Sequence, residues 1–546
     1  MKILTAFWPA PLLAGLLMYA SFQPLDLGWL MPVAWAILFL SMRLRGGRRA
    51  GWQVFVAAAV LFGPGVWWLV PLAWPIWLIV LLWCTGWEGL FGRFAGRLLR
   101  REGGPPAAWI VLLPAAHLAF DMLRTVVLSG FPWMLPGYAG WRNPVLLGSA
   151  DLIGVHGATL ATLVLAAGLA EAAARCLRGE AYRASALAPA ASLWTALAGW
   201  ALAKPAIEER PGPWVLLLQP SIPQEWKEDL VQSGREAPTA VTFWRRHEDL
   251  AKQGLEKAVA DGHGIDLVVW GETMVPATAR RPFTLGEPLL TFTQNPDGRG
   301  SSWMPADGRR IAEASSGAET LAGIPSVDVT PGRAELYFNT VVLLDDRGRV
   351  RGHQDKQHLT PGGEYIPLRG LIPFRETFEE YLRSAVGFVP DLQPGEAGHV
   401  VGLQSGAKAG IMVCYESAYP EVPRGMVRSG ATVLFNCSNY GWFSHTAEMQ
   451  QAVAICAFRA AELRRSIVLA SNNGISVVLG PDGTQRGQAT EPDVETFLVA
   501  RAPLADSVSP FTRIGEWGAS VLGAAATFAS LLMARRTVPA VPSRAS

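Results

Sequence analysis

Long apolar stretches separated by short basic connections occupy the first 205 residues of the chain. A helix that crosses a membrane needs about 20 mostly apolar residues, and this criterion predicts seven spans before residue 205 and one near the C-terminus. The predicted spans lie near residues 4–20, 24–42, 52–70, 72–91, 107–128, 148–174, 186–203 and 515–534. The pattern therefore predicts a multi-pass α-helical membrane bundle over residues 1–204, and a C-terminal transmembrane helix with a cytoplasmic tail over residues 514–546.

Every second connection between the predicted spans is rich in arginine. Arginine clusters follow the second, fourth, sixth and last predicted spans: Arg43, Arg45, Arg48 and Arg49; Arg93, Arg97, Arg100 and Arg101; Arg175, Arg178 and Arg183; Arg535 and Arg536. Short cytoplasmic loops retain Lys and Arg. The pattern therefore predicts a cytoplasmic N-terminus and export of residues 205–513. The alternative for the first segment is a cleaved signal peptide ending in LMYASF, which would leave the predicted export unchanged.

From Trp214 onward, short apolar runs alternate with polar stretches of helical character, over about 236–260 and 446–464. The runs are continuously apolar, as in WVLLLQ, LVVW and GIMV, which is typical of strands buried on both faces. We therefore predict an α/β sandwich in the exported segment, with a long surface loop over residues 294–308.

Composition agrees with a membrane protein, since half of the residues are apolar and 17% are charged. A net charge of +2, without a basic stripe interleaved with aromatic residues, argues against nucleic-acid binding. The five cysteines show no disulfide framework. Cys456 recurs at helical spacing with apolar residues, which predicts that it packs in the core.

Three of these stretches each end at a residue whose side chain could take part in catalysis. LVVW is followed by Glu272, the stretch VVLLDDRGRVRGHQD by Lys356, and GIMV by Cys414. A single buried Cys is more often structural than catalytic, and a single Lys is more often solvated. Catalytic groups, however, collect at the carboxyl ends of strands in α/β sheets, so the three together favour a site.

These three groups suit thiol chemistry. A thiol with an ordinary pKa near 8.5 is mostly protonated at neutral pH, so a nucleophilic Cys414 needs a base or a positive neighbour. Glu272 would take the proton, and Lys356 would favour the thiolate and stabilise the oxyanion formed on an attacked carbonyl. The expected product is an acyl thioester.

Several motifs in this order resemble the carbon-nitrogen hydrolase (nitrilase) superfamily, and with the membrane spans they resemble its membrane-embedded branch, the apolipoprotein N-acyltransferases. The motifs are SGFPWMLPGYAG, QPSIPQEWK, VVWGET, DKQHLTPGGEYIPLRG, GIMVCYESAYPE, SNYGWF and RAAELRRSIVLASNNGIS. The resemblance implies an α-β-β-α sandwich for residues 205–513. It also implies that Cys414 is the nucleophile, Glu272 the general base and Lys356 the oxyanion partner.

The resemblance also implies roles for residues around these three. Glu364 and Glu416 would support catalysis, and Tyr415 and Trp442 would contact substrate. The alternative for Trp442 is a hydrophobic loop anchor, and the alternative for Glu416 is pairing with a nearby cation.

This sequence departs from the family pattern at several positions near the site. Gly271 stands where Pro is common, Gly362 and Gly363 stand where Phe-Gly is usual, Tyr440 stands where Asp is frequent, and Asp355 where Asn often precedes the lysine. None of the three predicted catalytic positions is affected. Added glycines loosen the backbone, so these departures bear on the acyl pocket and its loops.

The resemblance implies a reaction held at the bilayer surface. A membrane phospholipid would donate a fatty acyl chain, and the free α-amino group of a diacylglyceryl-cysteine lipoprotein would accept it, in the inner membrane of a bacterium with the catalytic domain in the periplasm. We expect ping-pong kinetics, no metal or other cofactor and a monomer. The alternatives are a membrane-anchored amidase of the nitrilase type and a non-catalytic membrane scaffold.

Charged and aromatic residues in the membrane part need separate consideration. Asp121 and Arg124 lie on one helix face and are predicted to neutralise each other, with phospholipid head-group contact as the alternative. Glu88 and Glu171 are predicted to extend to the membrane surface. The apolar loop 368–389 and the segment around Phe131 are candidates for membrane-dipping walls of the site, or for ordinary packing.

Overall fold

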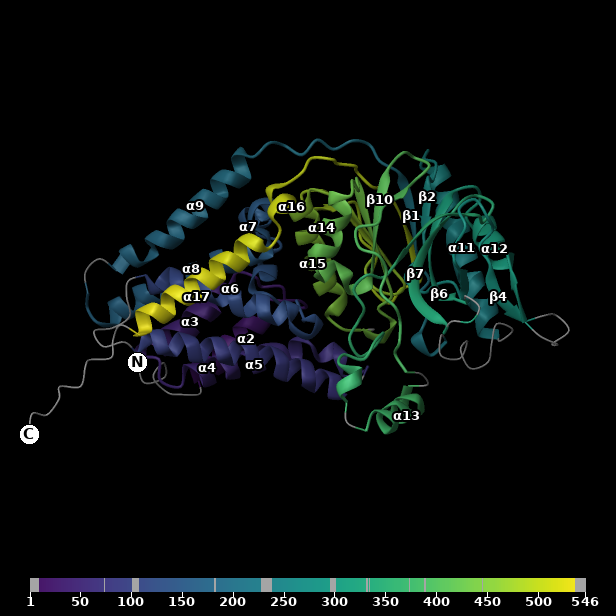
Figure 1. The fold of residues 1–546 in the computed structure, drawn as a ribbon. Helices are drawn as coiled ribbons and strands as arrows, with labels where there is room; N and C mark the ends of the chain where they lie inside the picture. The colour runs from purple at the N-terminus through teal and green to yellow at the C-terminus, as the bar shows by residue number, and fades with distance from the viewer. Residues whose placement is uncertain are drawn as a thin grey trace, which may run out of the picture. The chain divides into compact units, whose positions relative to one another are not determined.

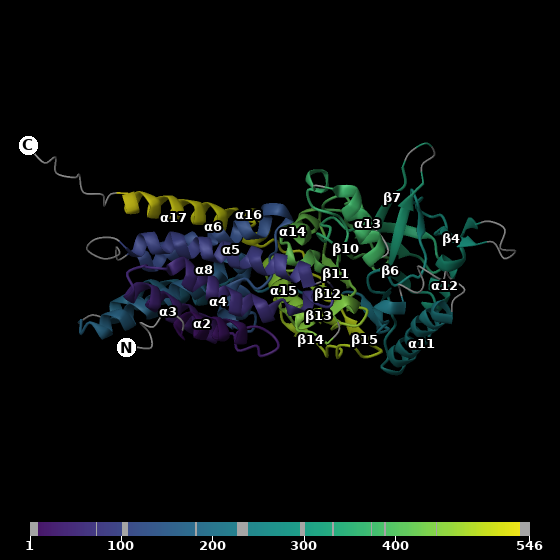
Figure 2. The same cartoon turned by 90° about the horizontal axis from the view of Figure 1, so that it is seen from below.

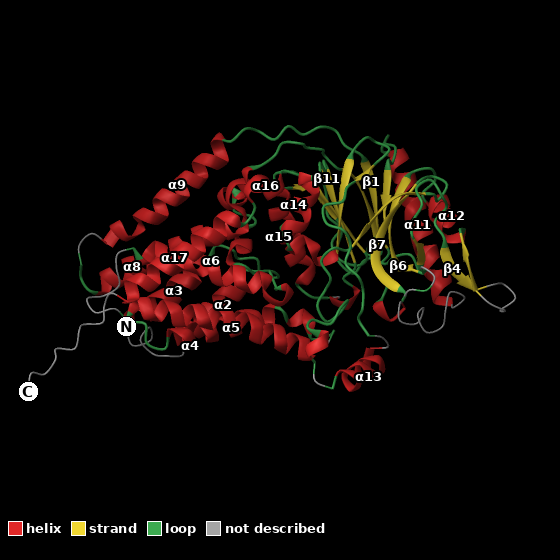
Figure 3. Ribbon diagram, in the orientation of Figure 1, coloured by secondary structure: helices red, strands yellow, loops and turns green. Residues whose placement is uncertain are grey.

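The computed structural model describes residues 9–72, 74–100, 108–180, 183–226, 238–294, 301–329, 332, 334–372, 374–386, 389–443 and 445–535. By compactness the chain divides into a helical unit, Met1–Pro205 with Arg513–Ser546, and an α/β unit, Ala206–Thr512. Figure 1 labels the elements of both units, and Figure 3 distinguishes their helices from their strands.

The helical unit contains an apolar helix at each predicted span. Its helices are α2 (Pro9–Ala20), α3 (Leu30–Leu44), α4 (Ala50–Gly65), α5 (Trp74–Leu99), α6 (Trp109–Val126), α7 (Pro144–Gly148), α8 (Ala150–Leu177), α9 (Ala188–Ala203) and α17 (Trp517–Arg535), with 3-10 turns η1 (Trp67–Leu69), η2 (Val127–Ser129), η3 (Pro136–Gly140) and η4 (Arg183–Leu187). Residues 4–8, 73 and 107 of the predicted spans, and Arg101 and Arg536, lie outside the described residues.

Length separates these helices into two groups. Among the described residues, four helical stretches are long and apolar enough to cross a membrane: Trp74–Leu99, Trp109–Ser129, Ala150–Leu177 and Ala184–Ala203. The shorter apolar helices are Pro9–Ala20, Leu30–Leu44, Ala50–Gly65 and Trp517–Met533. The unit therefore has the composition of a membrane bundle.

A buried polar network joins α5, α6 and the segment after α6. The predicted Asp121–Arg124 pair is confirmed at 3.4 Å. Arg124 also donates to the backbone carbonyls of Phe131 and Trp133, both at 3.0 Å, and only 1% of its surface is exposed. The guanidinium thus holds the backbone of the predicted aromatic segment against α6.

Glu88 does not extend to the surface as predicted. Its side chain is buried and lies 3.2 Å from Nε2 of His117, whose Nδ1 is 3.4 Å from Asp121. The prediction was wrong because it considered Glu88 on its own helix only, whereas His117 of α6 supplies a partner inside the bundle. Glu171 is also buried, and it pairs with Arg43 and Arg175 at 3.3 and 3.0 Å.

The α/β unit is built from two packed sheets in the part of the chain that is described. One sheet contains β1 (Trp214–Gln219), β2 (Leu267–Val269), β3 (Ala279–Arg281), β4 (Thr291–Gln294), β5 (Ser301–Met304), β6 (Glu319–Asp328), β7 (Leu336–Leu344), β8 (Val350–Asp355) and β15 (Thr496–Arg501). The other contains β9 (Val401–Gly402), β10 (Lys408–Val413), β11 (Val433–Ser438), β12 (Ile467–Ser471), β13 (Val477–Leu479) and β14 (Gln485–Arg486).

Helices cover the outer face of each sheet. They are α11 (Pro238–Ala260) and α12 (Ala306–Ala314) on the first sheet, and α14 (Glu421–Arg428) and α15 (Glu448–Leu463) on the second. The remaining helices are α13 (Arg375–Val386) and α16 (Pro510–Ile514), with 3-10 turns η5 (Arg369–Leu371), η6 (Cys414–Ala418) and η7 (Gly441–Phe443). Figure 2 shows α15 alongside β12 and β13.

The central strands are buried on both faces because a second sheet lies on one side and helices lie on the other. β1, β2 and β6 run parallel to one another, as do β10, β11 and β12. Apolar side chains of both sheets form one core cluster, which includes Val215, Val269, Val413 and Val468. The predicted α/β sandwich is thus observed, and continuous apolar runs mark its central strands.

The structure differs from the prediction in three stretches. Residues 350–355 form β8, a strand that pairs antiparallel with β7. No apolar run marks this strand because most of its residues are polar. Within the predicted loop 294–308, Ser301–Met304 pairs with β4 and α12 begins at Ala306, while residues 295–300 lie outside the described residues. The loop predicted over 368–389 contains η5 and α13. In the two polar stretches that form strands, pairing with a neighbouring strand decides the structure.

We predict that Arg124→Leu destabilises the helical unit by about 3 kcal/mol, because it leaves Asp121 and two backbone carbonyls buried without their cation. Thermal unfolding of the full chain in detergent measures the loss. Arg97→Leu is the matched control, since Arg97 is exposed on α5. Equal transition temperatures for the two variants would contradict the inferred role.

Candidate active site

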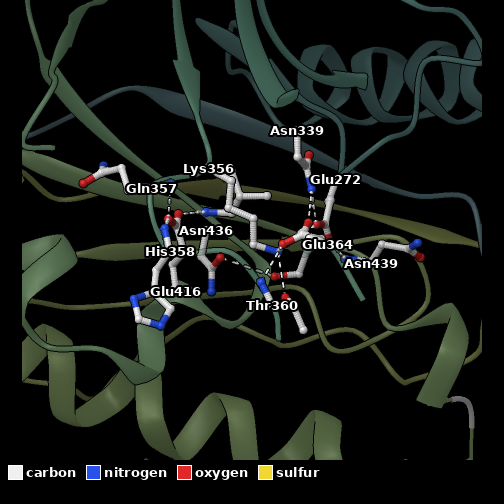
Figure 4. Close-up of polar contacts among 12 residues, drawn as sticks. Glu272, Asn339, Lys356, Gln357, His358, Thr360, Glu364, Glu416, Asn436 and Asn439 are labelled. Atoms are coloured by element: carbon white, nitrogen blue, oxygen red, sulfur yellow. Dashed lines mark hydrogen bonds and ion pairs between the residues drawn. The ribbon is translucent and has the colours of Figure 1, made fainter. Parts of the chain in front are cut away.

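The three predicted catalytic residues stand at the carboxyl ends of three strands. Glu272 follows β2, Lys356 directly follows β8, and Cys414 directly follows β10. β2 and β8 belong to one sheet and β10 to the other. The packing of the two sheets brings the three side chains together, as Figure 4 shows for Glu272 and Lys356. Cys414 adopts a left-handed backbone with φ of 57°, a strained conformation that occurs often at functional sites.

Lys356 lies buried between two carboxylates. Its Nζ is 3.4 Å from Glu272 and 3.1 Å from Glu364, and it donates to Oγ1 of Thr360 at 3.3 Å. Glu364 and Glu272 raise the pKa of Lys356 against the opposing effect of burial, so the ammonium keeps its charge at neutral pH. A fixed cation of this kind suits the stabilisation of an oxyanion.

Asn339 is a residue of the site that the sequence did not reveal. Its side-chain amide donates to Glu272 at 2.7 Å and to Glu364 at 2.9 Å. The only signal was a polar residue inside the apolar run of β7, which by itself indicates neither partner. Backbone N–H groups also donate to these two carboxylates. Asn439 N–H donates to Glu272 at 3.1 Å, and Thr360 N–H donates to Glu364 at 2.8 Å.

Glu272 and Lys356 both lie close enough to the thiol of Cys414 to act on it electrostatically. Burial and the charge of Glu272 raise the pKa of the thiol well above its usual value, and Lys356 lowers it by less. Lys356 thus acts in the expected direction, toward the thiolate, but desolvation outweighs the attraction of the ammonium. The resting group is a thiol.

Glu416 connects the loop of Lys356 to the loop of Cys414. Its carboxylate accepts hydrogen bonds from the backbone N–H groups of Gln357 at 2.6 Å, His358 at 2.8 Å and Val413 at 2.7 Å (Figure 4). Pairing with a nearby cation was the alternative, but these contacts are with backbone. Burial raises the pKa of Glu416 to about 7, although the backbone donors and Lys356 oppose this shift.

The two predicted substrate-binding residues differ in exposure. Tyr415 follows Cys414 in η6, and its hydroxyl contacts that of Tyr419. Trp442 lies in η7 with 38% of its surface exposed. An aromatic ring with this exposure is available to an apolar ligand.

Three of the departures from the family pattern, Gly271, Gly362 and Tyr440, occupy constrained or buried positions. A Cβ at Gly271 would lie 2.8 Å from the backbone oxygen of Ser438, so the chain approaches β11 closely there. Gly362 has φ of 81°, which favours glycine, and its N–H donates to the carbonyl of Tyr365. Tyr440 is buried, with 1% of its surface exposed.

Glu88, His117 and Asp121 have the spacing of metal ligands within the described part of the chain. His117 stands between the two carboxylates and each of its ring nitrogens faces one of them, which is the arrangement of an ion-pair network. The absence of a cofactor stays a prediction.

Comparison with known proteins assigns this chain to a family. The carbon-nitrogen hydrolase family model matches residues 186–508, which is more than half of the chain. The chain belongs to the carbon-nitrogen hydrolase family. Residues 14–168 match the model of the apolipoprotein N-acyltransferase N-terminal domain. This carbon-nitrogen hydrolase is therefore an enzyme of the membrane-embedded branch that its motifs resemble.

Similar proteins align along almost the whole length of this carbon-nitrogen hydrolase. The apolipoprotein N-acyltransferase of Geobacter metallireducens is 28% identical over 96% of this chain and 95% of its own length. That of Brucella suis is 28% identical over 87% of this chain and 82% of its own. Among solved structures, Saccharomyces cerevisiae Nit3, a nitrilase superfamily member, is 16% identical, with 62% of this chain and 98% of Nit3 covered and a TM-score of 0.36.

We predict that Asn339→Leu destabilises the protein by about 2 kcal/mol, because two carboxylates beside Lys356 lose their shared donor. Thermal unfolding of the full chain measures the loss. Gln253→Leu on the exposed face of α11 is the control, and equal transition temperatures for the two variants would argue against a bridging role.

Glu416 should make stability depend on pH. Its pKa is raised from 4.5 to about 7 in the folded protein, so between these values the folded state binds more protons than the unfolded state, and stability falls as pH rises. We expect Glu416→Gln to flatten this fall, measured by the transition temperature from pH 4.5 to 7.5. Glu256→Gln, at an exposed position of α11, should keep the wild-type slope. An unchanged slope in Glu416→Gln would refute the assignment.

Proposed function

We propose that this protein transfers a fatty acyl chain from a membrane phospholipid, through a thioester on Cys414, to the N-terminal α-amino group of diacylglyceryl-cysteine apolipoproteins. The observation that carries the proposal is the pair of buried Lys356 and Glu272 at 3.4 Å, both of which act electrostatically on the thiol of Cys414. Apolipoprotein N-acyltransferases that align over most of the chain support this choice of substrates.

In the first half-reaction, Glu272 takes the proton from Cys414 as Sγ attacks the ester carbonyl of the phospholipid. The pKa of the thiol is raised, so deprotonation has to accompany attack. Lys356 stabilises the oxyanion that forms. The ester C–O bond then breaks, the lysophospholipid oxygen leaves with the proton held by Glu272, and the acyl group remains on Sγ.

In the second half-reaction, the α-amino group of the acceptor attacks the thioester. The N–C bond forms, Glu272 takes a proton from the nitrogen, and the C–S bond breaks as the proton returns to Cys414. Glu364 and Asn339 hold Lys356 and Glu272 in place, and Glu416 holds the loop after Lys356. Tyr415 and Trp442 are proposed to contact substrate.

The substrates of this reaction explain the proposed topology. Both are held in a bilayer, so the α/β domain, residues 205–513, is proposed to face the outer surface of the bacterial inner membrane. Seven spans in residues 1–204 and one in residues 514–546 achieve this, with arginine-rich connections on the cytoplasmic side. We propose that the protein acts as a monomer.

The assay that tests this function supplies phospholipid vesicles and a diacylglyceryl dipeptide to the purified protein, and follows amide and free fatty acid. Acylated peptide supports the proposal. Release of fatty acid without acylated peptide would instead identify a membrane-anchored amidase, and no turnover would favour a non-catalytic scaffold.

We predict that Cys414→Ser lowers acyl transfer roughly a thousandfold or more, because an alcohol is a much poorer nucleophile beside the same base. The transition temperature should stay close to that of the unchanged protein, which shows that folding is intact. Cys176→Ser is the control, since Cys176 is an exposed cysteine of α8. Mass spectrometry after exposure to lipid alone should find the acyl group on Cys414, and substantial turnover by Cys414→Ser would overturn the nucleophile assignment.

A further inference from the structure

Glu448 is a buried acid of the α/β unit that the mechanism above does not use. It is the first residue of α15, which packs against η6, the turn that begins with Cys414. Only 2% of its surface is exposed, and no described residue forms a hydrogen bond with its Oε2. The carboxyl group therefore keeps an unused acceptor.

The position of this carboxyl follows from the packing of its helix. α15 packs against η6, which places the start of this helix in the neighbourhood of Cys414. In agreement, a negative charge on Glu448 would raise the pKa of Cys414, of Tyr440 after β11 and of Cys456 within α15. Burial raises the pKa of Glu448 itself well above its usual value, so at neutral pH the group is an uncharged acid.

The other carboxyl groups of the site have partners. Glu272 and Glu364 accept from Asn339 and contact Lys356, and Glu416 accepts three backbone hydrogen bonds. A buried polar atom without a partner costs about 1–3 kcal/mol. Such a cost is tolerated where the atom serves a function. The free acceptor of Glu448 therefore indicates a ligand that supplies a hydrogen-bond donor beside Cys414.

We propose that the carboxyl group of Glu448 forms the subsite that receives the amino group of the acceptor, an inference that rests on the acyl transfer proposed above. An N–H of the amine donates to Oε2, which leaves the nitrogen lone pair free to attack the thioester. Burial disfavours a charged ammonium and so selects the neutral, nucleophilic amine. The N–C bond then forms, and the C–S bond breaks as Glu272 passes a proton from nitrogen to sulfur.

Two substitutions separate this subsite from the rest of the reaction. Glu448→Leu removes the acceptor atom, whereas Glu448→Gln keeps an amide oxygen that can accept the same N–H. With vesicles of phosphatidylethanolamine and phosphatidylglycerol and no acceptor, we expect the unchanged protein and both variants to form similar amounts of acyl-Cys414 by mass spectrometry. With a diacylglyceryl dipeptide, the KM for the peptide should rise about tenfold in Glu448→Leu and much less in Glu448→Gln.

The outcomes distinguish the two proposals. Normal acyl-Cys414 with an unchanged KM in Glu448→Leu would overturn the subsite and leave the proposed function standing. Lower acyl-Cys414 in both variants, with normal transition temperatures, would place Glu448 in the first half-reaction and also overturn the subsite. If the unchanged protein forms no acyl-Cys414, the proposed function itself fails. Glu256→Gln on α11 should match the unchanged protein throughout.

Discussion

The burial of Lys356 between Glu272 and Glu364 is the interaction on which the site depends. A buried ammonium is tolerated only with close counter-charges, and both carboxylates lie within 3.4 Å of it. The same contacts fix the base beside the thiol and leave a cation where an oxyanion would form. Removing Lys356 would leave two neighbouring carboxylates without their shared cation, so stability and chemistry rest on the same atoms.

The sandwich supplies these groups because strands of both sheets end at the site. Glu272 and Lys356 come from one sheet and Cys414 from the other, so the contact exists only when the two sheets pack. Glu416 ties the loops after β8 and β10 together through three backbone hydrogen bonds. The rigidity of the site thus comes from backbone contacts across the sandwich rather than from any single loop.

In the helical unit, too, a buried cation has close partners. Arg124 is as fully buried as Lys356, and it pairs with Asp121 and donates to two backbone carbonyls. In both units a buried cation holds irregular backbone or acidic side chains in one arrangement. Glu448 differs from Glu272, Glu364 and Glu416, since its Oε2 forms no hydrogen bond among the described residues.

The sequence by itself determined the apolar helices, the central strands and the residues that follow them, because hydrophobic periodicity and the end of an apolar run are local properties. Glu272, Lys356 and Cys414 could be named on that basis. The partners of these residues could not. Asn339 is an ordinary polar residue of β7 until folding places it between two glutamates, and Glu88 finds His117 only when α5 packs on α6. Polar strands such as β8 were missed because their pairing partners decide them. The protonation of Cys414 was also decided by the tertiary structure, because desolvation depends on everything packed around the sulfur and outweighs the one charge that the sequence suggested.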